Sequence, residues 1–489
     1  MVNEINVIVN NAQIAFSTFR SSSGQMRKNL LYTIAEELEK EGESICNIAS
    51  SETNLPMARF QGELGRTCYQ LRLFGDLSLE GSWINAVIDT ADENRKPLRK
   101  PDMRKMSVPL GPIVVFGASN FPLAYSTPGG DTASALAAGC PVIVKGHPAH
   151  PQTSQKVADI ISVAVIKSGL PKGVFQHIIS SSFEVGRLLV QHPGISGVGF
   201  TGSLQGGKAL YNYAQERDVP IPVFAEMGSV NPVILFKNAL LEKTPELAKM
   251  YAASITIGVG QFCTNPGILV GIKSSALNHF TSLLALELSM SKSYKMLHEG
   301  IYKSYCKGLD HILFEKGVET VYHAHEKEDL TASPVLARVE AKEFLKNAHL
   351  QEELFGPFSL IVVCENVKEL EGVWKSFSGQ LTTSIIGTDE DITLHKDLIQ
   401  DACQFSGRIV FNGPPTGVEV SHATVHGGPF PATTDGRFTS VGSDAILRWV
   451  RPVCWQDCPK ILLPDSLKDQ NSTGILRKIN GEFTRDSIT

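Results

Sequence analysis

Short apolar runs alternate with helix-like stretches from residue 108 onward, and this alternation constrains the fold more than any other feature of the chain. The apolar runs of the first half are Pro112–Phe116, PVIVKGHP, VFQHIIS, GISGVGFTGS and PVFAEMGS, with helical patterns between most of them. Strands and helices that alternate at this spacing predict βαβ units and a parallel sheet, which binds ligands at the carboxyl ends of its strands.

The same alternation repeats over about 229–430 and predicts a second α/β domain. Residues 1–76 carry apolar residues close to a 3.6 period, which predicts amphipathic helices. The polar stretch 80–107 suits a short excursion or hairpin, and 431–489 is typical of an irregular, polar tail. At 489 residues the chain is too long for one simple core, so we expect at least two large domains.

Composition excludes several classes of function. An apolar content of 42%, a charged content of 19% and a net charge of −5 are ordinary for a globular protein. No Lys/Arg-rich tract indicates a nucleic-acid partner, and no apolar run has the length of a membrane span.

Nine scattered cysteines and an N-terminus unlike a signal peptide favour a cytoplasmic protein. Cys454 and Cys458 form a C-x3-C pair that we interpret as structural, with zinc as a remote alternative, and we expect no metal site.

Four loops that follow predicted strands carry polar side chains. Asn120 in GASNFP could donate an amide N–H to an oxyanion, although asparagine also favours turns. Lys145 in VKGHPAHP leaves a buried strand toward the ligand-binding edge, where the plainer interpretation is a solvated lysine. The turn FTGSLQGG (200–207) opens a helix whose N–H groups could hold a pyrophosphate. Glu226 in FAEMGS ends an apolar strand, where a carboxylate is either a desolvated base or at the surface.

Cys263 lies in GVGQFCTNPG (258–267), among turn-forming residues and just before the apolar run Ile268–Ile272. A cysteine on a loop that leads into a strand can present its sulfur to a cleft. A cysteine that only fills a core would more naturally lie within the run. Because free cysteines are usually buried, this stretch alone leaves a catalytic and a structural interpretation open.

Taken together and in this order, these stretches and EELFGP (352–357) resemble the aldehyde dehydrogenase superfamily over nearly the whole chain, as far as GGPFP at 427–431. The resemblance implies an α/β fold with a Rossmann-like cofactor domain, an α/β catalytic domain and a small oligomerisation segment. It places the dinucleotide-binding domain at 1–79 and 108–228 and the catalytic domain at 229–430. Residues 80–107 and 431–489 would form the oligomerisation and tail segments of a homodimer or homotetramer. Family members usually begin with a small β-hairpin, whereas this chain begins almost at the first helix.

The resemblance also implies a chemistry. Cys263 would be the nucleophile that attacks an aldehyde carbonyl and forms a thiohemiacetal. Asn120 and the backbone N–H of Cys263 would hold the oxyanion. After hydride transfer to a nicotinamide cofactor, Glu226 would activate the water that hydrolyses the thioester.

The implied cofactor is NADP, with NAD as a possibility. By resemblance, Lys145 binds the adenosine ribose or a 2′-phosphate, Glu353 binds the nicotinamide ribose and Phe355 packs beside the nicotinamide. Pro148 stands where NAD-preferring members typically carry an acidic residue, and His147 and His150 lie nearby. The absence of a carboxylate at 148 favours NADP. The other cofactor-binding residues that we predict are Ser119, Gly202, Ser203 and Gly206.

Within the superfamily the chain most resembles 2-oxoglutarate semialdehyde (2,5-dioxopentanoate) dehydrogenases and NADP-dependent long-chain aldehyde dehydrogenases. The shared marks include QGELGRT, FAEMGSVNP, GQFCTNPG and RPVCWQDCPKILLP. Arg66 lies on the helix that lines the substrate tunnel in the family, where it would bind the carboxylate of a short acidic aldehyde. Its alternative role is a structural ion pair with Glu63. A tunnel for fatty aldehydes would instead be apolar, and Phe121, Tyr125 and Phe262 could line it.

Two other classes of protein remain as alternatives. One is a non-catalytic relative of the superfamily, which the joint presence of Cys263, Glu226 and Asn120 argues against. The other is a dehydrogenase that transfers the acyl group to CoA. Such enzymes typically lack the water-activating glutamate, so Glu226 favours hydrolysis.

Overall fold

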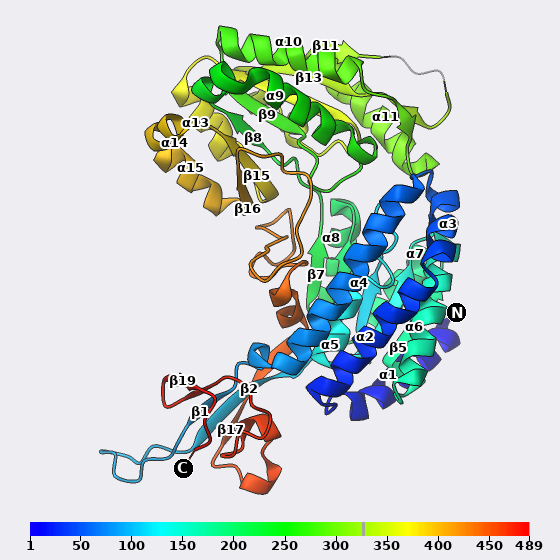
Figure 1. The fold of residues 1–489 in the computed structure, drawn as a ribbon, viewed down its shortest axis with the longest axis vertical. Coiled ribbons are helices and arrows are strands. Elements are labelled where there is room, and N and C mark those ends of the chain that lie inside the picture. Colours follow the sequence, from blue (N-terminus) through cyan, green and yellow to red (C-terminus); the bar gives the residue numbers. More distant parts are fainter. Residues whose placement is uncertain (325–327, 489) are drawn as a thin grey trace.

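The computed structural model describes residues 1–324 and 328–488, and Figure 1 shows two lobes and a narrow β-arm that extends from one end. The chain begins with four helices, which confirms the prediction for residues 1–76. They are α1 (Val2–Phe19), α2 (Gly24–Lys40), α3 (Gly42–Thr53) and α4 (Met57–Glu80). Apolar side chains at helical spacing, such as Leu30, Leu31 and Ile34 of α2, are buried. Helix α4 ends at Gly81, whose φ of +76° suits glycine.

A parallel five-stranded sheet forms the core of the first lobe, in the order β5-β4-β3-β6-β7. The strands are β3 (Ile113–Phe116), β4 (Val142–Gly146), β5 (Phe175–Ile179), β6 (Gly197–Thr201) and β7 (Val223–Glu226). The helices between them are α5 (Gly130–Ala138), α6 (Pro151–Lys167), α7 (Phe183–Gln191) and α8 (Leu204–Gln215). All five predicted strands are confirmed, whereas α7 lies where the pattern predicted no element. The strand order reverses between β3 and β6, so the loops that follow these two strands border a ligand crevice.

The second lobe contains a seven-stranded sheet, in the order β11-β13-β14-β9-β8-β15-β16, in which only the edge strand β11 is antiparallel. The strands are β8 (Val233–Leu235), β9 (Ile268–Ile272), β11 (Glu319–His323), β13 (Val335–Glu340), β14 (Phe358–Cys364), β15 (Gln380–Ile386) and β16 (Ser406–Phe411). Its main helices are α9 (Lys237–Thr256), α10 (Ser275–Ser289), α11 (Glu299–Phe314) and α13 (Val367–Ser376). The second predicted α/β unit is confirmed.

The β-arm corrects one expectation, because the last part of the chain is not an irregular tail. It supplies β17 (Val450–Gln456), β18 (Arg477–Ile479) and β19 (Glu482–Thr484), which join β1 (Val87–Asp89) and β2 (Met103–Pro109) in one sheet. Strand β17 pairs with β2 along seven residues, and β1 pairs with β18. These pairings connect segments more than 340 residues apart, which no local pattern indicates (Figure 1).

Each lobe packs its sheet between helices around apolar clusters. Trp449, which precedes β17, belongs to the cluster of the first lobe, and its indole N–H donates to the Ser134 hydroxyl of α5 at 2.7 Å. Arg448 forms a buried ion pair with Asp131 of α5 at 2.8 Å. These contacts fix the end of the long 412–442 connection against the first lobe. Across residues 1–324 and 328–488, no helix is both long and apolar enough to cross a membrane.

Candidate active site

Cys263 lies on a constrained loop between α9 and β9. The three residues Gly258, Val259 and Gly260 all have positive φ, of 57°, 59° and 65°. Valine rarely adopts this conformation, so the turn stores backbone strain. A Cβ at Gly260 would lie 2.2 Å from the carbonyl oxygen of Gly356, so only glycine lets these two backbone segments meet. The loop is thereby fixed against the segment that carries Glu353 and Phe355.

Asn231 holds the cysteine loop from the other side. Its side-chain amide donates to the carbonyl of Cys263 at 2.8 Å and to that of Asn265 at 2.9 Å. Asn231 is fully buried and is itself held by Gln380, whose side-chain oxygen accepts its backbone N–H. This chain of contacts gives the half-buried sulfur a defined position.

Glu226 ends β7 and is 3% exposed. The connection 426–440 runs beside it, since the N–H of Met227 donates to the carbonyl of Ala432 at 2.8 Å. This connection brings two side chains to the carboxylate. The Ser440 hydroxyl donates to Oε2 at 2.7 Å, and Nε2 of His426 lies 3.0 Å from Oε1.

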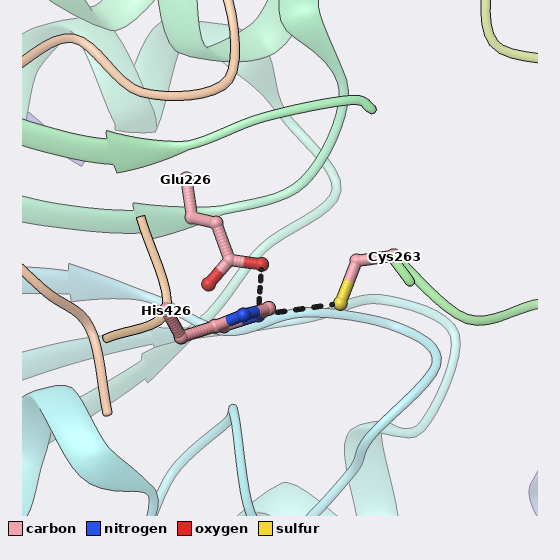
Figure 2. Close-up of side chains that lie close together, drawn as sticks. All are labelled: Glu226, Cys263 and His426. Atoms are coloured by element: carbon pink, nitrogen blue, oxygen red, sulfur yellow. Dashed lines mark hydrogen bonds and ion pairs between the residues drawn. The ribbon is translucent and has the colours of Figure 1, made fainter. Parts of the chain in front are cut away.

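His426 is the central residue of the site, as Figure 2 shows. Its Nε2 lies 3.4 Å from Sγ of Cys263 as well as 3.0 Å from Glu226, and the ring is fully buried. When the ring proton is on Nδ1, Nε2 can accept the thiol proton, and Glu226 then stabilises the imidazolium. No pattern in the sequence singled out His426 as a site residue. A feature that could have pointed to it is its position directly before the stretch GGPFP at 427–431.

The charges of the resting site favour a neutral thiol. Burial and the nearby Glu226 carboxylate raise the pKa of Cys263 well above its usual value. Burial alone would raise the pKa of Glu226, but His426 and Ser440 hold it below its usual value. The sulfur therefore needs a base at hand to become a nucleophile, and His426 occupies that position.

Asn120 reaches the cysteine loop from the end of β3. Its side-chain amide donates to the carbonyl of Gln261 at 3.1 Å, two residues before the nucleophile. Arg59 of α4, which the sequence did not single out, donates to the carbonyl of Asn120 at 2.5 Å. The Arg59 guanidinium also lies 4.5 Å and 4.9 Å from the ring centroids of Phe121 and Phe262. Helix α4 thus positions the predicted oxyanion donor.

The three predicted tunnel aromatics lie together. Phe121 is 5.2 Å from both Tyr125 and Phe262, ring centre to ring centre, and Tyr125 is 6.1 Å from His426. Arg66 donates to the Tyr125 hydroxyl at 3.2 Å and to the Val418 carbonyl. These contacts place a cation beside Tyr125, the aromatic residue whose ring neighbours His426.

The alternative pairing of Arg66 with Glu63 is not formed in the described part of the chain. Glu63 instead accepts the backbone N–H groups of Leu123 and Ala124, at 2.8 Å and 2.9 Å, and its nearest cation is Arg59 at 3.9 Å. A second arginine that the sequence analysis missed, Arg408 of β16, donates to the carbonyls of Pro415 and Gly417. Burial lowers the pKa of Arg408, but the neighbouring Cys263 and Tyr125 favour its charged form.

The predicted cofactor residues line the carboxyl edge of the first sheet. Lys145 at the end of β4 pairs in register with Phe116 of β3, and within residues 1–324 and 328–488 its ammonium has no hydrogen-bond or ion-pair partner. Burial lowers its pKa. The ring of His147 stacks on His150 at 5.6 Å and lies 6.2 Å from His298 of the second lobe. Burial and these neighbours lower the pKa of His147 to about 3.

The glycine turn after β6 is open to solvent. Ser203 caps α8 by accepting the N–H of Gly206 at 3.2 Å, and the N–H of Gly202 donates to the Glu226 carbonyl at 3.1 Å. Ser119 lies half-buried in the loop after β3. These loops flank the point where the strand order reverses.

Glu353 and Phe355 approach from the second lobe. A Cβ at Gly228 would lie 2.4 Å from a carboxylate oxygen of Glu353, so the absence of a side chain there makes room for the acid. Phe355 lines a small cavity behind the cysteine loop together with Phe262 and Gly260. The structure therefore brings the predicted catalytic and substrate residues together, with the predicted cofactor residues on the neighbouring loops of the two lobes.

Comparison with known proteins gives a consistent result. The model of the aldehyde dehydrogenase family matches residues 2–396. The chain is 45% identical over 487 residues to alpha-ketoglutaric semialdehyde dehydrogenase of Acinetobacter baylyi, covering 99% of this chain and 92% of the relative. It is also 45% identical over 472 residues to alpha-ketoglutaric semialdehyde dehydrogenase 2 of Azospirillum brasilense, covering 96% and 90%.

Solved structures share the fold at low sequence identity. A betaine aldehyde dehydrogenase from Staphylococcus aureus superposes with a TM-score of 0.79 at 16% identity, covering 95% of this chain and 90% of that one. A 1-pyrroline-5-carboxylate dehydrogenase gives a TM-score of 0.77 at 19% identity, covering 93% and 86%. The predicted fold class is confirmed.

Proposed function

Because the chain belongs to the aldehyde dehydrogenase family, we propose that it oxidises an aldehyde to a carboxylic acid through a covalent intermediate on Cys263. The observation that carries this proposal is the contact of His426 with both Cys263 and Glu226. The contact with Cys263 makes His426 available as a base for the thiol proton. The contact with Glu226 stabilises the positive charge that His426 then carries.

Each residue then has a defined task. His426 takes the proton of Cys263, and the thiolate attacks the aldehyde carbon. Asn120 and the backbone N–H of Cys263 stabilise the oxyanion of the thiohemiacetal. A bound nicotinamide cofactor supplies the hydride acceptor that turns this adduct into a thioester. Glu226 removes a proton from the water that attacks the thioester, and His426 returns its proton to the departing sulfur, which releases the acid and restores the thiol.

Glu226 favours water over CoA as the acyl acceptor. It is a buried carboxylate whose lowered pKa keeps it ionised, so it is able to accept a proton from water. A dependence of turnover on added CoA would argue for an acylating enzyme instead. A failure to reduce either cofactor with any aldehyde would argue for a non-catalytic relative.

We propose 2-oxoglutarate semialdehyde as the substrate and 2-oxoglutarate as the product. Two relatives at 45% identity carry the name of this activity. Arg66 supports the same conclusion, because no carboxylate of the described residues lies within ion-pair distance of its guanidinium, which can receive the acid of the substrate. The alternative is a medium- or long-chain fatty aldehyde, which the aromatic wall of Phe121, Tyr125 and Phe262 would favour.

Replacing Arg66 with alanine is expected to lower kcat/KM for 2-oxoglutarate semialdehyde by about 10- to 150-fold, the worth of a charged hydrogen bond. The value for decanal should change little, because decanal has no carboxylate. Arg72→Ala is the matched control, since Arg72 lies on the same helix and pairs with Glu39 at the surface. A wild type that prefers decanal, together with an Arg66→Ala variant that keeps its activity on the acidic substrate, would refute the assignment.

For the cofactor we propose NADP in preference to NAD. The chain fits a dinucleotide because an unpaired, half-buried lysine lies at the sheet edge and a capped, solvent-open helix N-terminus follows β6. Lys145 and His147 would contact the 2′-phosphate. Pro148 is uncharged and would not repel it. Ser119, Gly202, Ser203 and Gly206 would border the pyrophosphate, and Glu353 and Phe355 would hold the nicotinamide end.

Replacing Lys145 with alanine is expected to raise the dissociation constant of NADP by about 10- to 150-fold, with a smaller loss for NAD. Isothermal titration with each oxidised cofactor measures both constants without turnover. Lys156→Ala is the control, because Lys156 pairs with Glu41 on the surface of α6. Tighter binding of NAD than of NADP by the wild type would contradict the proposed preference.

We also propose a homodimer or homotetramer that assembles through the β-arm, in a reducing cytoplasm. The arm exposes Ile461, Leu462 and Phe483, each at least 68% accessible. All nine cysteines are free thiols. The cofactor domain would comprise 1–79 and 108–228 and the catalytic domain 229–430, with the assembly segments at 80–107 and 431–489.

A further inference from the structure

The residues of the catalytic centre are also a set of metal ligands. Cys263, His426 and Glu226 each offer one ligand atom, and these sulfur, nitrogen and oxygen atoms all lie within 4.8 Å of one another. Thiolate, imidazole and carboxylate are the three side-chain ligands that zinc uses in proteins. The sequence predicts no metal site here, because the three residues are separated by up to 200 positions and lack the close spacing that is typical of metal ligands in a sequence.

The spacing of the ligand atoms fits one tetrahedral ion. Bonds of about 2.3 Å to sulfur and about 2.0–2.2 Å to nitrogen and oxygen place neighbouring ligand atoms about 3.4–3.6 Å apart at tetrahedral angles. In the structure Sγ and Nε2 are 3.4 Å apart, and Nε2 and Oε1 are 3.0 Å apart. The third pair, Sγ and the Glu226 oxygen, lies within 4.8 Å, so a shift of about an ångström at this pair would complete the geometry.

One carboxylate oxygen faces the other two ligand residues. Oε1 of Glu226 is buried and lies 3.0 Å from Nε2 of His426, whereas Oε2 accepts the Ser440 hydroxyl. Ser440 therefore orients the carboxylate with Oε1 toward the histidine and the cysteine, as a hydrogen bond to a metal-ligating carboxylate does.

We propose that Zn²⁺ binds to Cys263, His426 and Glu226 and inhibits the enzyme reversibly. Binding releases the thiol proton to solvent and forms the S–Zn bond, and the two negative ligands balance the charge of the ion. The fourth position is left for water. The bound ion blocks the sulfur of Cys263, which must attack the aldehyde, and Nε2 of His426, which must take the thiol proton. Zinc and the aldehyde therefore compete for the same site. Nδ1 of His426 has no hydrogen-bond partner among the described residues, so the affinity is lower than that of a structural zinc centre.

Zinc binding is tested on the full-length, metal-free enzyme in a Cys454→Ser, Cys458→Ser background, which removes the other closely spaced cysteines. Titration calorimetry with ZnCl₂ is expected to give one ion per chain. Zinc should slow alkylation of the Cys263 peptide by iodoacetamide at least tenfold, as followed by mass spectrometry. The Cys306 peptide provides the internal control. EDTA should restore both alkylation and turnover.

Two variants locate the ion. His426→Gln and Glu226→Gln are each expected to weaken zinc binding by about 100-fold or more and to abolish the protection of Cys263. His422→Gln, an exposed histidine four residues away, should bind zinc like the parent. Binding that persists in both active-site variants, or zinc that leaves Cys263 open to alkylation, would overturn the proposal. Zinc-free turnover of the same preparations tests the proposed function separately.

Discussion

Replacing Cys263 with serine is expected to reduce kcat for aldehyde oxidation by about 10⁴-fold or more, as loss of a nucleophile does in other covalent enzymes. A serine hydroxyl ionises far less readily than a thiol, and the buried site beside Glu226 opposes a further negative charge. Steady-state cofactor reduction measures the loss. Mass spectrometry after rapid quenching should show an acyl adduct on the wild type and none on the variant.

The matched control for this prediction is Cys306→Ser. Cys306 is also a free, half-buried cysteine, but it lies on α11 and not on the loop that holds Cys263. This variant should keep wild-type turnover and melting temperature. If Cys263→Ser retained a tenth or more of the activity while Cys306→Ser lost it, the nucleophile would be wrongly assigned.

Replacing His426 with glutamine is expected to lower kcat by about 10²- to 10⁴-fold, the usual contribution of a general base. Glutamine fills a similar volume but cannot take the thiol proton, so the acylation step slows. The pre-steady-state burst of reduced cofactor should therefore become slow. In Glu226→Gln the burst should slow less than in His426→Gln while the steady-state rate falls, because Glu226 acts on acylation only through the imidazolium of His426 but acts directly on the water of the later step.

His422→Gln serves as the control for this experiment as well, since it lies on the same connection with its side chain exposed. Binding of oxidised cofactor by calorimetry shows whether each variant retains its fold. A His426→Gln variant with an unchanged burst rate would show that another group deprotonates the thiol.

The alternation of strands and helices was enough to predict the two α/β units and most of their strands, although β11 and β13 were missed. Lys145 and Glu226 lie at the ends of strands, Asn120 follows a strand and Cys263 precedes one, and parallel strands bring such positions to shared edges. Their positions at the edges of the two sheets were therefore accessible from the sequence. Helix α7 was missed although its buried residues Val185, Leu189 and Val190 recur at helical spacing.

The residues that the sequence did not reveal reach the site through tertiary contacts. His426 comes from a connection without regular structure, which is placed by its pairing beside β7 and by the anchoring of Arg448 and Trp449 on α5. A tertiary contact also decides whether Arg66 pairs with Glu63. Glu63 accepts backbone N–H groups from a loop 60 residues away, and the helical spacing of the sequence does not indicate these hydrogen bonds.

The two arginines beside the active site hold the segment Pro415–Val418 by its backbone. Arg408 donates to the carbonyls of Pro415 and Gly417, and Arg66 donates to that of Val418. Because a carbonyl is present whatever the side chain, Val418 can be exchanged without breaking the bond that fixes its main chain. The side chain at position 418 can therefore change during evolution while Cys263, His426 and Glu226 stay unchanged. A library at position 418 is the natural starting point for redirecting this enzyme to new aldehydes.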